Sequence, residues 1–151
     1  MEKIKLKLGE ILQLGHEING FINPENGQKE YDGFLKQDIS IILKYELSEL
    51  GESLEKEKKK VDGLRDELIK KYGQEENGSL VVKMFIDELD EEGNLKTRQI
   101  NPKYIEFDKE FSELLNQEKE IEYPTITKQD LKDAGKTKDN YKILFKLVKK
   151  D

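Results

Sequence analysis

The stretch from Asn77 to Pro102, NGSLVVKMFIDELDEEGNLKTRQINP, separates two long charged segments whose apolar residues have helical spacing. Its first half alternates apolar and polar residues, as a strand does, and the apolar members of one face are Leu80, Val82, Met84 and Ile86. Gly93-Asn94 then supplies a turn, and residues 95–100 form a returning strand. We therefore predict a β-hairpin over residues 79–100.

The segment before this hairpin, residues 37–72, contains no proline and shows two heptad rows. The rows are Leu47, Leu54, Val61 and Leu68, and Leu43, Leu50, Glu57 and Leu64. A helix of about 36 residues would be about 54 Å long at ~1.5 Å per residue. Such a length exceeds what a compact domain of this size needs.

The segment after the hairpin also has the spacing of a helix. Asn101 is a good N-cap residue, and Pro102 suits the first helical position. Residues spaced alternately by three and four then follow, namely Tyr104, Phe107, Phe111, Leu114, Glu118 and Ile121. We predict that the two helices form an antiparallel, coiled-coil-like helical hairpin over residues 37–122. Phe107 and Phe111 would lie in its core or in an interface with a second subunit.

The two ends of the chain predict a small sheet beside this helical hairpin. Near the N-terminus, Ile4, Leu6 and Leu8 alternate with lysines, which favours a strand over residues 2–8. A short helix follows and ends at Asn19-Gly20, before a small hairpin or ordered loop. Alternating apolar residues over 141–148 predict a last strand, which we expect to pair with 2–8. The expected fold is thus a single α+β domain over residues 1–151.

The composition limits the classes of function. Charged residues make up 40% of the 151 residues, apolar residues only 34%, and the net charge is −6. The core is therefore thin, so we expect an elongated chain that completes its core as a homo-oligomer. Because the two signs of charge are interleaved, direct nucleic-acid binding is not expected. No apolar run is long enough for a membrane span, and the absence of cysteine excludes disulfides and thiolate chemistry.

No catalytic, cofactor-binding or metal-ligating residue is predicted. The single histidine, His16, has no nucleophile motif around it, so a structural or surface role is favoured. The acidic stretch 87–94 fails the calcium-loop pattern because Leu89 occupies a ligand position, and we interpret it as a solvated turn. Gly135-Lys136-Thr137 lacks the earlier glycine of a phosphate loop, since that position is Asp130. We expect a protein that is not an enzyme and needs no cofactor.

Two resemblances point to families. The order of helix, β-hairpin and helix over Gln37–Ile121 resembles the layout of β-type prefoldin subunits. The stretches MEKIKLKLGEILQL, LRDELIKKYGQEENG and EFSELLNQEKEIEYPTIT resemble small tailed-phage proteins of uncharacterised function. The second resemblance implies a viral origin, with the cytoplasm of an infected bacterium or the virion as the place of action, and it implies no catalytic residues.

These patterns favour a phage accessory protein that acts by binding a host or phage protein, with a host defence protein as the leading target. The candidate interaction surfaces are the hairpin, in particular Lys83, Phe85, Lys96 and Arg98, and the exposed faces of the long helix. One alternative is a virion, assembly or prefoldin-like chaperone component, in which the hairpin would add to a neighbouring sheet. Another is an oligomeric sponge for a nucleotide signal, in which Lys83, Lys96 and Arg98 would contact the ligand.

Overall fold

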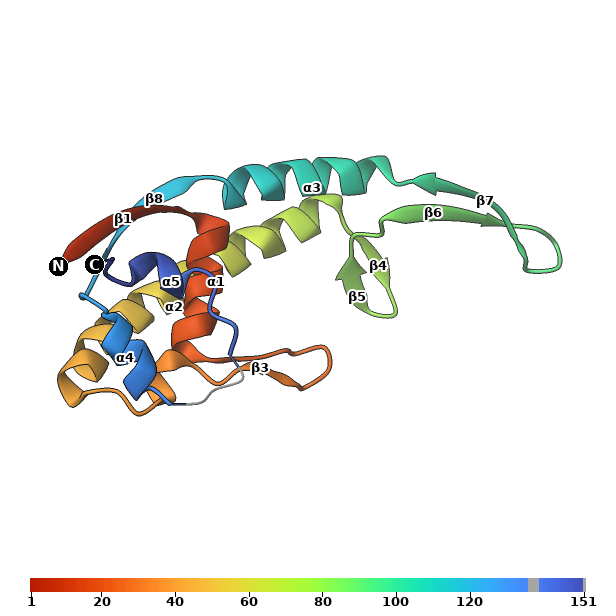
Figure 1. Ribbon diagram of the computed structural model, residues 1–151. Coiled ribbons are helices and arrows are strands. Elements are labelled where there is room, and N and C mark those ends of the chain that lie inside the picture. The colour runs from red at the N-terminus through yellow and green to blue at the C-terminus, as the bar shows by residue number, and fades with distance from the viewer. Residues whose placement is uncertain (136–138, 151) are drawn as a thin grey trace. The chain divides into compact units, whose positions relative to one another are not determined.

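The computed structural model describes residues 1–135 and 139–150, and it has a mixed α+β fold with small antiparallel sheets (Figure 1). The chain forms two compact units. Unit 1 comprises Met1–Lys59 and Gln117–Asp151, and unit 2 comprises Lys60–Asn116. The predicted long helix is present as α2 (Ile41–Tyr72), and the boundary between the units falls within it.

Unit 1 begins with elements that the sequence predicts well. Its elements are β1 (Glu2–Lys7), α1 (Leu8–Asn19), β2 (Phe21–Ile22), β3 (Lys29–Tyr31), the 3₁₀ helix η1 (Phe34–Lys36), the first part of α2, β8 (Glu118–Tyr123), α4 (Lys128–Asp133) and α5 (Leu144–Leu147). The strand over 2–8, the helix that ends at Asn19 and the small β2–β3 hairpin are confirmed. Gly20 ends α1 with a φ of 87°, and its N–H donates to the His16 carbonyl at 2.9 Å.

The partner of β1 differs from the predicted one. β1 pairs antiparallel with β8, and the second long helix, expected to reach residue 122, ends at Leu115. The register places Lys3, Lys5 and Lys7 opposite Glu122, Glu120 and Glu118. Opposite charges on facing residues stabilise a strand pair. Glu118 and Ile121 are therefore strand residues, and the helical row predicted for them is wrong.

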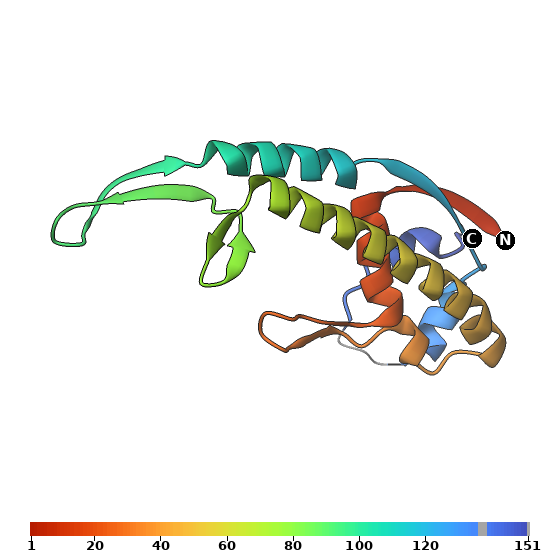
Figure 2. The same cartoon turned by 180° about the vertical axis from the view of Figure 1, so that it is seen from behind.

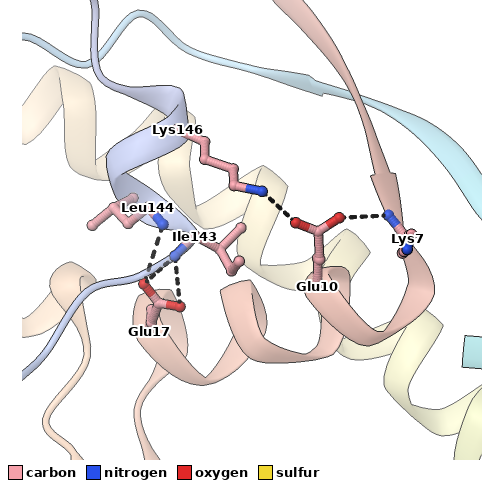
Figure 3. A network of polar contacts seen from close by, with 6 residues as sticks. All are labelled: Lys7, Glu10, Glu17, Ile143, Leu144 and Lys146. Carbon is pink, nitrogen blue, oxygen red and sulfur yellow. Dashed lines mark hydrogen bonds and ion pairs between the residues drawn. The ribbon is translucent and has the colours of Figure 1, made fainter. Parts of the chain in front are cut away.

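The strand predicted over 141–148 is also wrong. Residues 144–147 form α5, and this region makes only an isolated bridge, between Val148 and Ile126. The fully buried carboxylate of Glu17 in α1 accepts hydrogen bonds from the N–H groups of Lys142, Ile143 and Leu144 at 2.7–3.2 Å. Figure 3 shows the bonds from Ile143 and Leu144. Three consecutive N–H groups point to one carboxylate, which requires a tight turn. In a strand, successive N–H groups point in opposite directions, so residues 142–144 cannot be a strand.

The hydrophobic core lies in unit 1. It combines the first part of α2 with α1, β1, β8 and the C-terminal segment, and its fully buried members include Ile11, Leu14, Ile18, Phe34, Leu47, Ile126 and Leu144. The predicted rows of α2 are buried in this core as far as Leu54, and Val61, the next member of the first row, is buried within unit 2. Their cover comes from the N- and C-terminal segments.

Unit 2 contains the hairpin region as two ribbons. Its elements are the end of α2, β4 (Gln74–Glu76), β5 (Ser79–Val81), β6 (Phe85–Leu89), β7 (Leu95–Ile100) and α3 (Pro102–Leu115). The single hairpin predicted over 79–100 is wrong in its first strand. Asn77-Gly78, both with positive φ, form a two-residue turn that pairs β5 with β4, so that only β6 pairs with β7.

The start of α3 follows the prediction. The Asn101 side chain caps the helix by accepting from the Lys103 N–H at 3.1 Å, and Pro102 occupies the first turn. Within unit 2, α3 runs beside the end of α2 in both views (Figures 1 and 2). A 3.4 Å ion pair joins Lys71 to Glu110 there. Phe107 and Phe111 are half-buried, with ring centroids 5.9 Å apart.

Candidate interaction surface

The four predicted surface residues all belong to unit 2, on or beside the β6–β7 hairpin. Phe85 is the first residue of β6, Lys96 and Arg98 belong to β7, and Lys83 precedes β6 by two residues. In the register, Asp87 faces Arg98 and Phe85 faces Ile100. Facing residues of an antiparallel pair project to the same side of the ribbon. Arg98 and Phe85 therefore share one face.

Each of the three cations is paired with a carboxylate. The Arg98 guanidinium forms a two-point contact with Asp87 at 2.7 and 2.9 Å, and it lies 5.0 Å from the centre of the Phe85 ring. Lys83 pairs with Glu76 at 2.9 Å, and Lys96 pairs with Glu88 at 3.7 Å. The Arg98 contact lowers the pKa of Asp87 below its ordinary value. The hairpin has more carboxylates than cations and is not a basic patch.

The same face of the hairpin exposes large apolar side chains. Its strand pairs place Leu89 opposite Leu95 and Phe85 opposite Ile100. Leu89, Leu95 and Ile100 keep more than half of their surface in contact with solvent, and Phe85 keeps 39%. The Asp87–Arg98 pair separates these two apolar pairs along the ribbon. Isolated apolar residues are common on surfaces, whereas a contiguous apolar patch marks a site of interaction.

Phe85 and Ile100 belong to such a patch, because they line an apolar groove where the hairpin meets α3. The groove has a volume of about 490 Å³, and its apolar and aromatic lining residues are Met84, Phe85, Ile100, Tyr104 and Ile105. Asp108 and Lys109 also line it. The sequence assigned Tyr104 to a buried helical row and did not single out Ile105. Ile105 is next to Tyr104 in the sequence and therefore lies at the edge of the apolar stripe of α3. It becomes part of the groove because hairpin residues lie beside it.

The backbone of this ribbon also carries free edges. Among the described residues, β6 and β7 pair only with each other, so each strand has an outer edge that no other strand covers. Such edges are templates for pairing with a strand of another chain. A two-stranded ribbon is marginally stable by itself in water. The hairpin therefore has both side chains and backbone groups that a binding partner can satisfy.

Residues 90–94 of the acidic stretch form the predicted turn, whereas residues 87–89 belong to β6. The Asp90 side chain accepts from the N–H groups of Glu92 and Asn94 at 3.0 and 2.8 Å, and Gly93 has a φ of 86°. All five carboxylate residues of the stretch are exposed, although Asp87 and Glu88 pair with Arg98 and Lys96. Over residues 1–135 and 139–150, no group of three or more metal-ligating side chains is arranged to hold a metal ion.

The other singled-out residues lie outside this surface. His16 stacks on Phe21 with ring centroids 3.9 Å apart. Gly135 follows α4, and Lys136 and Thr137 of the rejected phosphate loop lie outside the described residues. In the part of the chain that the structure describes, no helix has the length and apolar character needed to cross a membrane. No protein-family model, curated protein or solved structure matches this chain.

Proposed function

We propose that this chain is a non-catalytic, phage-encoded accessory protein that acts by binding another protein, with a host defence protein as the target. We assign the contact surface to the apolar face of the β6–β7 hairpin and the adjoining groove on α3. The observation that carries this proposal is the exposure of the groove residues: Met84, Ile100 and Ile105 are 46%, 58% and 51% exposed.

The charge arrangement supports a protein partner. Protein interfaces combine an apolar and aromatic centre with a polar rim. The groove has this composition, because its apolar centre is accompanied by Asp108 and Lys109. The neutralised pair of Arg98 and Asp87 beside it can stay bonded when a partner excludes water. A nucleotide-binding role for the same cations would require breaking these pairs first.

We further propose that the apolar row of α3 packs against the end of α2 as a short helical hairpin that supports this surface. The ion pair of Lys71 with Glu110, the half-buried Phe107 and Phe111 and the buried Val61 support this arrangement. The support matters because a contact surface must keep its shape when no partner is present.

The test is affinity capture from infected cells with two matched variants of α3. Ile105→Lys places a charge in the groove, whereas Ser112→Lys places the same charge at an exposed position of the same helix outside it. We expect wild-type protein and Ser112→Lys to retain the same specific partner and Ile105→Lys to lose it by at least about tenfold, the ~1.4 kcal/mol expected of one central apolar contact. Equal capture by the two variants would remove the groove from the proposal.

The uncovered strand edges favour a second candidate function, that of a virion or assembly component. In this role β6 or β7 would extend the sheet of a neighbouring subunit, and a second copy of this chain is one possible neighbour. Quantitative mass spectrometry of purified particles separates the two functions. A fixed stoichiometric amount in the particle supports the assembly role, and absence from the particle supports the host-directed role.

A further inference from the structure

A second hollow, which the hairpin function does not use, lies in unit 1. It has a volume of about 440 Å³ and is enclosed by the end of α1, the β2–β3 hairpin, η1 and α2. Three lysines line it, Lys29, Lys36 and Lys58, together with the aromatic residues Phe21 and Tyr31. We propose that this hollow binds a small organic phosphate that carries a flat ring, as a nucleotide does.

The charge of the hollow is opposite to that of the chain. The whole chain has a net charge of −6, yet no carboxylate is among the described residues that line this hollow. The three lysines come from three different elements, β3, η1 and α2. Lys29 has an ion pair with Asp32 at 3.3 Å, which leaves a net positive charge around the hollow. Several ammonium groups that line one hollow attract a multiply charged anion such as a phosphate chain.

The aromatic wall supplies the second half of the chemistry. Phe21 lies nearly parallel to His16, at an interplanar angle of 12°, and the Lys58 ammonium group is 5.5 Å from the centre of the Phe21 ring. The Tyr31 hydroxyl accepts from the Gln13 side chain at 2.9 Å and donates to the Asn140 carbonyl at 3.1 Å. Both rings are therefore held in place. Fixed aromatic rings beside cations favour a ligand that has both a ring and an anionic group.

The walls of the hollow are joined by contacts that do not involve a ligand. The Asn19 side chain at the end of α1 donates to the Gly51 carbonyl of α2 at 3.0 Å. A Cβ atom at Gly20 would lie 2.9 Å from the Asp32 carbonyl oxygen, so α1 and the segment after β3 are in close contact. A site that is formed in advance does not spend binding free energy on ordering its walls. The volume also falls in the range of about 300–1,000 Å³ typical of small-ligand sites.

The experiment is isothermal titration calorimetry of the full chain with ATP, at low salt and without divalent metal. We expect saturable binding of ATP that weakens with added sodium chloride, and weaker binding of both adenosine and tripolyphosphate. The double variant Lys36→Ala/Lys58→Ala should bind ATP at least about tenfold more weakly, because charge-assisted contacts are lost. The matched control is Lys59→Ala, an exposed lysine of α2 that does not line the hollow, and it should bind as wild type.

Three results would overturn the proposal. They are no saturable heat at millimolar ATP, equal ATP affinity in the double variant and in wild type, and tripolyphosphate binding as tight as that of ATP. The three lysines line a hollow at the C-terminal end of α1, where positive charge also stabilises the helix dipole. If that is their only role here, the double variant will melt at a lower temperature, and ATP will not raise the melting temperature of the wild-type protein. None of these outcomes bears on the hairpin surface.

Discussion

Replacing Glu17 with alanine should strongly destabilise unit 1, because this carboxylate fastens the C-terminal segment to α1. It is fully buried and accepts from three consecutive backbone N–H groups, those of Lys142, Ile143 and Leu144. Figure 3 shows the last two. The N–H of exposed Lys142 can bond to water after the change, whereas those of Ile143 and Leu144 lose their acceptor. At about 1.5–3 kcal/mol for each bond to a charged group, the cost is about 3–6 kcal/mol. Domains have a total stability of about 5–15 kcal/mol.

The matched control is Glu10→Ala on the same helix. Glu10 forms an ion pair with Lys146 of the same C-terminal segment, and it accepts from the Lys7 N–H at 3.1 Å (Figure 3). Half of the Lys146 side chain is exposed, so the ion pair is screened by water. Losing this pair and the cap should cost at most about 2 kcal/mol.

The measurement is urea denaturation at pH 7, followed by near-ultraviolet circular dichroism. Buried Tyr141, whose ring meets Phe34 edge-on at 5.7 Å, reports on unit 1. The free energy of unfolding should fall more in Glu17→Ala than in Glu10→Ala. If the two variants lose the same free energy, the buried carboxylate does not secure the C-terminal segment, and the reasoning is wrong.

Other positions provide further tests of the fold and the hairpin. Leu54→Ala should lower the free energy of unfolding by about 2–5 kcal/mol in urea titrations, because Leu54 is only 2% exposed in the core. Gly33→Ala should lower the melting temperature, since Gly33 has a φ of 96° and a Cβ there would lie 2.7 Å from a backbone nitrogen. Gly63 is in open space within α2, so Gly63→Ala should raise the melting temperature, with a gain of about 0.5–1 kcal/mol in the free energy of unfolding. Arg98 lowers the pKa of Asp87, so their ion pair stabilises the hairpin at neutral pH and is lost as the pH falls through that lowered pKa. The measurement is the protection of hairpin amides against hydrogen exchange, corrected for the intrinsic exchange rate at each pH. Protection should fall at acid pH in the wild type and should not show this fall in Asp87→Asn.

Local patterns predict the elements that depend on nearby residues. The alternation of Ile4 and Leu6 with lysines predicts β1, and Asn101-Pro102 predicts the start of α3, because a strand period and a helix cap are written in a few adjacent residues. The start of α4 is also fixed by nearby residues, because Thr127 and Asp130 bond reciprocally there as a capping box.

Long-range pairing decides the elements that the sequence pattern misassigned. Residues 118–123 alternate glutamate with Lys119, Ile121 and Tyr123, but Ile121 also continues the helical spacing from Leu114. Pairing with the lysines of β1, more than 100 residues away, selects the strand. Similarly, residues 141–148 fit a period of two and a period of three, and the distant Glu17 selects the helical turn.

In the hairpin region one sequence signal has two meanings, and the sequence alone does not decide between them. Asn77-Gly78 is a strong signal for a two-residue hairpin turn, yet at the end of a long helix it is equally a stop signal. The candidate residues Phe85, Lys96 and Arg98 were located by alternation alone. Alternation does not predict the carboxylate partners of Lys96 and Arg98, because these depend on the strand register and on its irregularity between Glu88 and Leu89.

Hydrogen exchange of the purified protein, alone and with its captured partner, tests the central claim most directly. If the hairpin and the start of α3 form the contact surface, amide exchange in residues 84–89 and 95–105 will slow in the complex, while exchange in α1 stays unchanged. Protection confined to unit 1, with the hairpin exchanging as fast as in the free protein, would contradict the account.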